Sequence, residues 1–442
     1  MMKFINTLKD IFKIEELKNK ILLTIGLIAV YRFMASVPLP GIDPLQLSAL
    51  KESTSGGLLG LLNAFTGGAF ARASVMALGI MPYISASIVV QLMGIAVPYL
   101  QKLQKDGESG RKKITQITRW LTIAITLVQA PTYITAIKTQ FGLGPEAFLV
   151  GGVTFWVSSI IILTAGTIFA MWLGERITDK GIGNGISLLI TVGIIANFPA
   201  AFLQEFLSKT ENAGAGGLMM VLIEIIVWFV VILLTVLLVT AVRKIAVQYA
   251  RRTFAGSTQN VAGSRDYIPL KLNAAGVMPI IFAQAIMFLP LALGQKFPIL
   301  VGLTDPNGWQ YNVIFAILII IFSYFYTAIT IPTNKMAEDL KRSGGFIPGI
   351  RPGKDTADRL DSVLSRITFP GSLFLAGLSI LPAIVVQFGV QQGWSMFYGG
   401  TSLIIMVGVA IDTIQQINSY LLNNHYDGLM KPGNSNRKSN KQ

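Results

Sequence analysis

Long stretches without a charged side chain constrain this chain more than any other feature. Among the runs that contain no Asp, Glu, Lys or Arg are residues 73–101, 120–137, 147–174, 181–204, 272–295, 306–334 and 367–411. A helix needs roughly 20 apolar residues to cross about 30 Å of hydrocarbon, so each run supplies about one crossing and the last supplies two. Because 52% of all residues are apolar and only 13% are charged, we expect a polytopic membrane protein.

These runs, together with apolar stretches that hold an isolated charge, predict an all-α fold with ten transmembrane helices. The expected spans are 21–37, 72–97, 117–137, 152–174, 184–206, 216–240, 272–291, 311–331, 370–389 and 397–420. Lys and Arg number 29 on one side of these spans and 5 on the other. Since basic residues collect on the cytoplasmic side of a membrane, we expect a multi-pass protein with both termini in the cytoplasm.

Few side chains are available for catalysis or ion coupling. The chain has no cysteine, and its single histidine, His425, lies near the end, which argues against thiolate and histidine metal centres. The ionisable residues within the spans are mainly Arg32, Glu224 and Asp412. An intramembrane enzyme would need a Ser/Lys, paired Asp or His/Glu set at that depth. We therefore expect no enzyme, metal or cofactor, and a secondary transporter is the main alternative.

Residues 56–68 form an apolar segment that is too short to cross a membrane. Four of its side chains share one helical face between two glycine pairs, namely Leu58, Leu61, Leu62 and Phe65. A half-helix of this kind can enter protein-lined membrane depth and turn out again at its glycines. A helix that lies on the outer membrane surface is the alternative.

Two long loops on the cytoplasmic side, 241–271 and 332–369, together carry 13 basic residues. The first contains Arg251 and Arg252, and the second contains Lys341, Arg342, Phe346, Ile347 and Arg351 near a Gly- and Pro-rich turn. A basic loop with exposed apolar side chains, here expected at Phe346 and Ile347, suits the docking of a large soluble partner. The alternative is that both loops are simply solvated. Among nucleic acids we consider only ribosomal RNA as a partner, and we expect no binding of DNA.

The run Gly181–Gly185 has the glycine spacing of a phosphate-binding loop. It lacks the Lys-Ser/Thr pair of such loops, and no strand is expected before it. We interpret it as a cytoplasmic turn that caps the following helix.

Several motifs, in order along the chain, resemble those of the SecY family. They are Met81–Ile88, Gly107–Lys113, Met171–Glu175, Gly181–Ser187, Gly345–Gly353, Gly399–Leu403 and Tyr426–Met430. The resemblance implies the central channel subunit of the Sec translocon in a bacterial inner membrane. Such a subunit would conduct unfolded secretory proteins across the membrane and release transmembrane segments sideways into lipid. It also implies two inverted halves of five helices, here 1–206 and 207–425, followed by a cytoplasmic tail at 426–442.

The resemblance also assigns roles to individual residues. A ring of apolar side chains would seal around a threading polypeptide: Ile84, Ile88, Ile186, Ile190, Ile281 and Ile405. Such a ring offers no hydrogen bonds to a passing chain and resists wetting. A plug within about residues 41–71 would carry the apolar face at Leu58, Leu61, Leu62 and Phe65. A lateral gate between the second and third spans on one side and the seventh and eighth on the other would hold Gln91, Gln129 and Gln284.

The implied partners are the SecE and SecG membrane subunits, the SecA motor ATPase, the ribosome, signal sequences, unfolded preproteins and membrane lipids. Within the two basic loops, Arg351 is the expected contact with the large partners. The residues themselves place Ile84, Ile281 and Ile405 near the middle of their expected spans.

Overall fold

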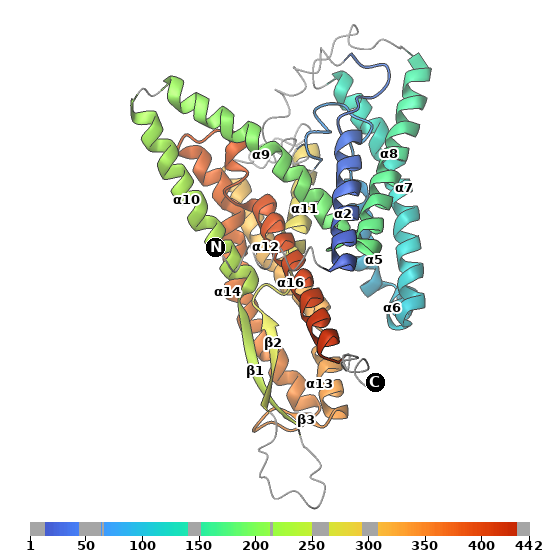
Figure 1. The fold of residues 1–442 in the computed structure, drawn as a ribbon, viewed down its shortest axis with the longest axis vertical. Helices are drawn as coiled ribbons and strands as arrows, with labels where there is room; N and C mark the ends of the chain where they lie inside the picture. The colour runs from blue at the N-terminus through green and yellow to red at the C-terminus, as the bar shows by residue number, and fades with distance from the viewer. Residues whose placement is uncertain are drawn as a thin grey trace, which may run out of the picture. The chain divides into compact units, whose positions relative to one another are not determined.

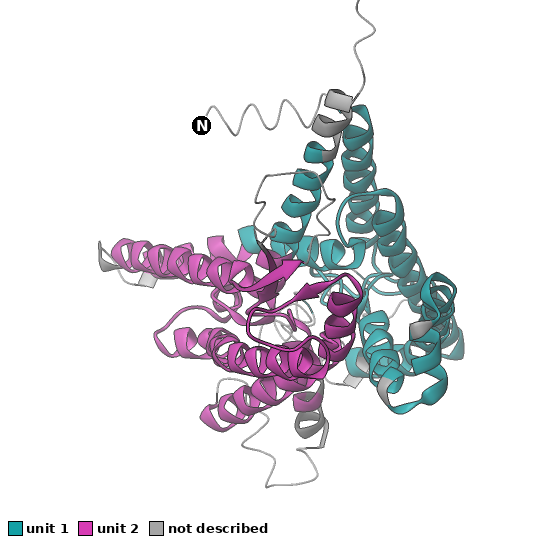
Figure 2. Ribbon diagram, turned by 90° about the horizontal axis from the view of Figure 1, so that it is seen from below, with its two compact units in different colours: residues 1–199, 409–442 teal, residues 200–408 magenta. Residues whose placement is uncertain are grey.

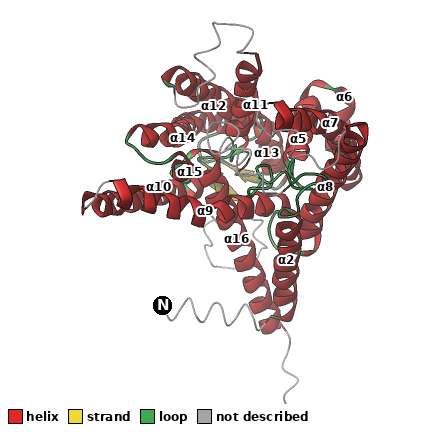
Figure 3. Cartoon of the chain, turned by 90° about the horizontal axis from the view of Figure 1, so that it is seen from above, coloured by secondary structure: helices red, strands yellow, loops and turns green. Residues whose placement is uncertain are grey.

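The computed structural model describes residues 14–43, 63, 66–139, 152–212, 215–249, 265–293 and 308–430, and most of these residues are helical (Figure 3). In chain order the elements are α2 (Glu15–Met34), α5 (Met81–Ala96), α6 (Pro98–Lys105), α7 (Gly107–Thr139), α8 (Gly152–Lys180), α9 (Gly185–Asn212), α10 (Ala215–Thr240), β1 (Val242–Tyr249), β2 (Arg265–Lys271), α11 (Met278–Leu293), α12 (Trp309–Thr330), α13 (Thr333–Arg342), β3 (Gly345–Phe346), α14 (Lys354–Gln387), α15 (Gln392–Ser395) and α16 (Gly400–Met430).

The chain forms two compact units (Figure 2). Unit 1 comprises residues 1–199 and 409–442, and unit 2 comprises residues 200–408. Two helices, α9 and α16, contribute residues to both units. The predicted division at residue 206 separates two inverted five-helix halves, whereas these units are defined by contacts between residues. The inverted halves therefore stay a prediction.

Seven of the described helices are long and apolar enough to cross a membrane, namely α7, α8, α9, α10, α12 (with α13), α14 and α16. The pair α5 and α6 is bent by 101° and counts as one further span if taken together. The two remaining predicted spans correspond to α2 and α11, which are not among the helices that are long and apolar enough by this measure. Five of the 20 residues of α2 are charged, and the structure describes 16 residues of α11. The predicted α-helical membrane fold is confirmed, with one small sheet in addition.

The helix α10 shows why these sequences fold in lipid. Its large apolar side chains are exposed on several faces, with Leu218 and Phe229 each 62% and Leu233 60% accessible. In water this exposure would forfeit about 25 cal/mol for every Å² of apolar surface left unburied, whereas hydrocarbon imposes no such penalty. An apolar surface around the whole helix is the pattern of a membrane span.

The second predicted span, 72–97, begins later than expected, because α5 starts only at Met81. Residues 66–80 form a series of turns instead of a helix. Backbone hydrogen bonds tie this turn segment to the chain after α2, from Leu39 N to Ala73 O (2.8 Å) and from Val75 N to Val37 O (2.9 Å). Apolar turns and apolar helices have the same composition, so hydropathy alone did not separate them.

The two basic loops contain a small sheet that the sequence analysis did not predict. Its three strands run in the order β2-β1-β3 with antiparallel pairing, and β3 comes from the second loop. Four buried apolar residues form its core with α13 and α14, namely Val247, Leu340, Ile347 and Leu360. Figure 1 shows the sheet beside α13. The two loops are therefore one folded structure.

Candidate functional site: apolar helix starts and the basic sheet

The six predicted ring isoleucines lie in two groups, with Ile84, Ile88, Ile186 and Ile190 in unit 1 and Ile281 and Ile405 in unit 2. None of the six is classed as exposed, and the most buried, Ile405, is only 6% accessible. Isoleucines on the lipid-facing surfaces differ clearly, since Ile161 is 62% and Ile226 is 54% accessible. The six side chains therefore do not belong to the lipid-facing surface.

All six isoleucines lie within the first eight residues of a helix. Ile84 is the fourth residue of α5, Ile281 is the fourth of α11, and Ile405 is the sixth of α16. These three fall near the middle of the predicted spans but near the start of the helices, because α5, α11 and α16 each begin after turns that the hydropathy pattern included in the span. Their place in the middle of a span stays a prediction. Ile186 and Ile190 also lie near the start of a helix, as the second and sixth residues of α9.

In unit 1, Ile84 and Ile186 pack against one buried cluster that includes Tyr31, Met76 and Leu173. Close approach of α8 and α9 sets the position of Ile186. A Cβ built on Gly174 would lie 2.8 Å from the Ile186 Cγ1 atom, and one built on Gly185 would overlap the Gly174 carbonyl oxygen. Both helices therefore need glycine at this crossing.

The Gly181–Gly185 turn is a packed connection, as predicted, rather than a phosphate site. The Ile182 amide donates to Thr24 Oγ1 (3.1 Å), and the Gly183 amide donates to Gln416 Oε1 (2.8 Å). These two amides therefore already have protein partners. Through them the turn joins α2 and α16 within unit 1.

In unit 2, one hydrogen bond connects the helices that carry Ile281 and Ile405. Gln284 Nε2 donates to Thr401 Oγ1 at 2.6 Å. Gln284 lies one turn after Ile281, and Thr401 lies one turn before Ile405, so this bond fixes the two isoleucines relative to each other. Gln284 thus has a definite partner, which the sequence could not supply.

The other two predicted gate residues lie in unit 1. Gln91 Nε2 donates to Ser87 Oγ on its own helix at 3.3 Å, and Gln129 on α7 is half-buried. The helices α5 and α7 that carry them pack together. Their place in a gate between the halves stays a prediction.

The basic residues of the second loop are presented at the surface. Lys341, Arg342 and Arg351 are exposed, and the Arg351 carbonyl accepts a hydrogen bond from Thr356 Oγ1 (2.9 Å). The prediction that Ile347 is exposed was wrong, because it is 7% accessible and packs in the core of the sheet. Phe346 is half-buried, because β3 pairs with β1.

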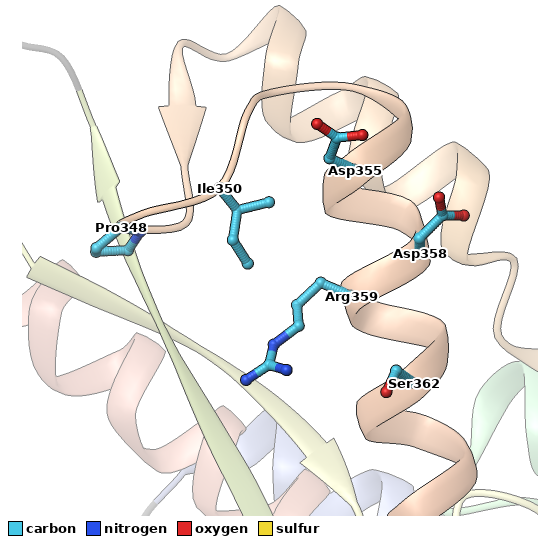
Figure 4. Close-up of a pocket in the computed structure, with 6 residues that line it drawn as sticks. All are labelled: Pro348, Ile350, Asp355, Asp358, Arg359 and Ser362. Atoms are coloured by element: carbon cyan, nitrogen blue, oxygen red, sulfur yellow. The ribbon is translucent and has the colours of Figure 1, made fainter.

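Beside this surface lies an open hollow of about 540 Å³ (Figure 4). Pro348 and Ile350 line it from the loop after β3, and Asp355, Asp358, Arg359 and Ser362 line it from the start of α14. In Figure 4 the Arg359 side chain extends toward the strands. The hollow therefore has both acidic and basic side chains, whereas the neighbouring surface presents basic ones. Within the described ranges, no group of acidic, histidine or cysteine side chains could hold a metal.

Several predicted residues cannot be placed. The plug residues Leu58, Leu61, Leu62 and Phe65 and the loop residues Arg251 and Arg252 lie outside the described residues.

Comparison with known protein families gives a match over most of this chain. The model of the SecY family matches residues 74–414. The chain belongs to the SecY family. The SecY-family match includes all six isoleucines, both basic loops and the three predicted gate residues.

Curated relatives match this SecY-family chain over almost its whole length. The "Protein translocase subunit SecY" of Streptomyces galbus is 39% identical over 436 residues, which cover 95% of this chain and 98% of the relative. The protein of the same name from Haemophilus influenzae is 40% identical over 431 residues, which cover 95% of each chain. The one from Aquifex aeolicus is 38% identical over 434 residues, covering 96% of this chain and 99% of the relative.

Solved structures show the same fold as this SecY-family chain. One, described as "The structure of a protein conducting channel", aligns with a TM-score of 0.61 at 19% identity and covers 93% of this chain and 94% of the other. A second, concerning the plug domain of the SecY protein, aligns with a TM-score of 0.62 over the same shares, also at 19% identity. Sec61 from a canine ribosome-channel complex aligns with a TM-score of 0.55 at 18% identity, again covering 93% and 94%.

One buried charged cluster in this SecY-family chain was not predicted as a cluster. Lys209 Nζ lies 3.4 Å from Glu224 Oε1 and 3.8 Å from Glu205 Oε1, and it donates to the Gly389 carbonyl at 2.8 Å. The Gln391 amide donates to Glu205 Oε2 at 2.8 Å. Glu205 is 1% and Glu224 9% accessible, so two carboxylates share a single ammonium group in the interior of unit 2.

Aromatic side chains enclose this cluster. Tyr398 donates its hydroxyl hydrogen to the Glu224 carbonyl (2.8 Å), and Trp228 Nε1 donates to the Phe397 carbonyl (2.9 Å). Trp394 is 2% accessible and its ring meets that of Tyr398 edge-on at 6.1 Å. The turn between α14 and α16 is therefore fixed to α9 and α10 by both charge and packing.

Proposed function

We propose that this chain is the central channel subunit of the Sec translocon, which conducts unfolded secretory proteins across the inner membrane and releases transmembrane segments sideways into lipid. The observation that carries the proposal is the near full-length match to proteins named translocase subunits. The six isoleucines support it, because branched apolar side chains kept off the lipid surface suit a seal that neither binds a passing chain nor wets.

The ring, plug and gate are parts of the same proposal. Ile84, Ile88, Ile186, Ile190, Ile281 and Ile405 would form the constriction. Leu58, Leu61, Leu62 and Phe65 would form the apolar face of the plug, and Gln91, Gln129 and Gln284 would line the gate. The direct bond between Gln284 and Thr401 favours a role for Gln284 in holding α11 near α16.

The partners would be SecE and SecG within the membrane and SecA and the ribosome at the basic loops. Similarity to Sec61 from a ribosome-channel complex supports the ribosome among these. With 29 Lys and Arg on the side of the basic loops and 5 opposite, both termini would lie in the cytoplasm. The chain would be a conduit and not an enzyme, so the energy for transport would come from a partner or the membrane potential.

Reversing the charge of Arg351 tests the docking part of this proposal. The variant Arg351→Glu should lower recovery of ribosomes or SecA with the solubilised complex by about tenfold, because an exposed charge of the wrong sign opposes association. Arg111→Glu makes the same charge change at an exposed position on α7, outside the two basic loops, and serves as the matched control. Recovery of SecE and SecG should not change. Equal loss with both variants would show only a general charge effect, and no loss would remove Arg351 from the interface.

A further inference from the structure

Arg32 is a charged residue in the last turn of α2, within a predicted membrane span. It forms no ion pair among the residues that the structure describes, and its Nη1 atom donates to the carbonyl oxygen of Gly67 at 2.9 Å. Charged side chains are costly at membrane depth and are retained where they do specific work. The proposed channel function gives Arg32 no role so far.

The Gly67 backbone is held between Arg32 and α9. Gly67 has a φ of +65°, and a Cβ built on it would overlap Arg32 Nη1 and lie 2.8 Å from the Cα atom of Gly193. Gly193 lies three residues after Ile190, so the contact is one helical turn away from a predicted ring residue. The Gly67 backbone therefore lies between the Arg32 side chain and the Gly193 backbone, one helical turn from Ile190.

The turn segment that contains Gly67, residues 66–80, is held by hydrogen bonds to Asn63 and α7 and leads into the other ring helix of unit 1. The Gly68 amide donates to the Asn63 carbonyl (2.8 Å), and the Ala71 amide donates to Asn63 Oδ1 (3.0 Å). From α7, the Tyr133 hydroxyl donates to the Phe70 carbonyl (2.7 Å). The segment ends at Ile80, directly before α5 with Ile84. A shift at Gly67 would therefore reach both α5 and α9.

From these contacts we infer that Arg32 is a positioning residue of the pore ring: its guanidinium clamps Gly67 against Gly193 and so fixes the starts of α5 and α9, which carry the ring isoleucines of unit 1. The inference rests on the proposed channel function for its meaning, but the clamp itself is a local contact. Arg72 provides a matched comparison, because its Nη2 atom lies 3.1 Å from a Cβ built on the next residue, Gly68, and its side chain is exposed.

The clamp is tested first by a labelling experiment that does not depend on transport. The chain has no native cysteine, and Thr66 beside Gly67 is 2% accessible. A Thr66→Cys variant should react slowly with a membrane-impermeant maleimide, and adding Arg32→Ala should raise the rate about tenfold, since loss of a charge-assisted hydrogen bond favours local opening. Arg32→Lys, which keeps a cationic donor, should restore most of the protection, and Arg72→Ala should leave it unchanged. A Thr356→Cys variant, buried at the start of α14 and outside the turn segment, should stay protected throughout.

The second readout is ion conductance of the resting complex in planar bilayers. Arg32→Ala should raise it several-fold while Arg32→Lys and Arg72→Ala stay near the wild-type value. If Arg32→Ala changes neither labelling nor conductance, the clamp does not exist. If labelling rises but conductance does not, Arg32 holds the turn segment without positioning the ring, which also overturns the inference. A failure of the channel proposal can be distinguished from these results. In that case, replacing the ring isoleucines themselves would leave the conductance unchanged.

Discussion

Replacing Lys209 with methionine should lower the free energy of unfolding by about 3–5 kcal/mol, the usual cost of removing one partner from a buried ion pair. Lys209 is the ammonium group that Glu205 and Glu224 share, and both glutamates are less than a tenth accessible. Methionine fills much of the same volume but leaves two buried carboxylates without a cation. The expected result is a large drop in the thermal midpoint of the detergent-solubilised protein.

Two controls separate charge from packing in this prediction. Lys335→Met makes the same change at an exposed position and should leave the midpoint almost unchanged. Combining Lys209→Met with Glu205→Gln and Glu224→Gln removes the unpaired charges and should recover much of the loss. A Lys209→Met variant that melts like the wild type would show that the cluster contributes no net stability.

Introducing polar side chains into the ring should have the largest functional effect. The double variant Ile84→Asn and Ile405→Asn should raise resting ion conductance by about tenfold or more, because a polar constriction wets more readily than an aliphatic one. It should also loosen selection of signal sequences, measured as export of a reporter with a defective signal. Ile161→Asn makes the same change on an isoleucine that faces away from the protein interior and should affect neither readout. Unchanged leak and unchanged export in the double variant would count against the assigned ring.

The helices were predictable because their signal is long and redundant. The helix α10 is apolar over its 26 residues apart from Glu224 and two threonines, and a segment of this length and composition is typical of a membrane span. The sheet was missed because β1 and β2 lie in a loop that was interpreted by its basic charge alone, and because β3 is only two residues long. Only pairing between two distant loops gives Val247 and Ile347 a core, and sequence periodicity carries no information on that pairing.

The candidate site was only partly predictable from the residues. Isoleucine is common in membrane helices, so the resemblance to a family, and not the pattern, singled out the six ring positions. The charged cluster did leave a signal in the sequence, since Glu205 and Lys209 are four residues apart and Glu224 is an isolated charge in an apolar run. The turn that brings Gly389 and Gln391 to them could not be foreseen. Likewise, Arg32 stood out as a charge within a span, but its partner is a backbone carbonyl that no sequence pattern reveals.

The central claim is that unfolded polypeptide passes through the ring, and site-specific photo-crosslinking to a stalled exported chain tests it most directly. A photoreactive residue would replace Ile84, Ile190, Ile281 or Ile405 in turn, with Ile161, Ile226 and Ile321 as comparison positions more than half accessible on outward helix surfaces. We expect adducts with the stalled chain from each ring position and from none of the comparison positions. No adducts from the ring positions, or equal crosslinking from the comparison positions, would contradict the proposal.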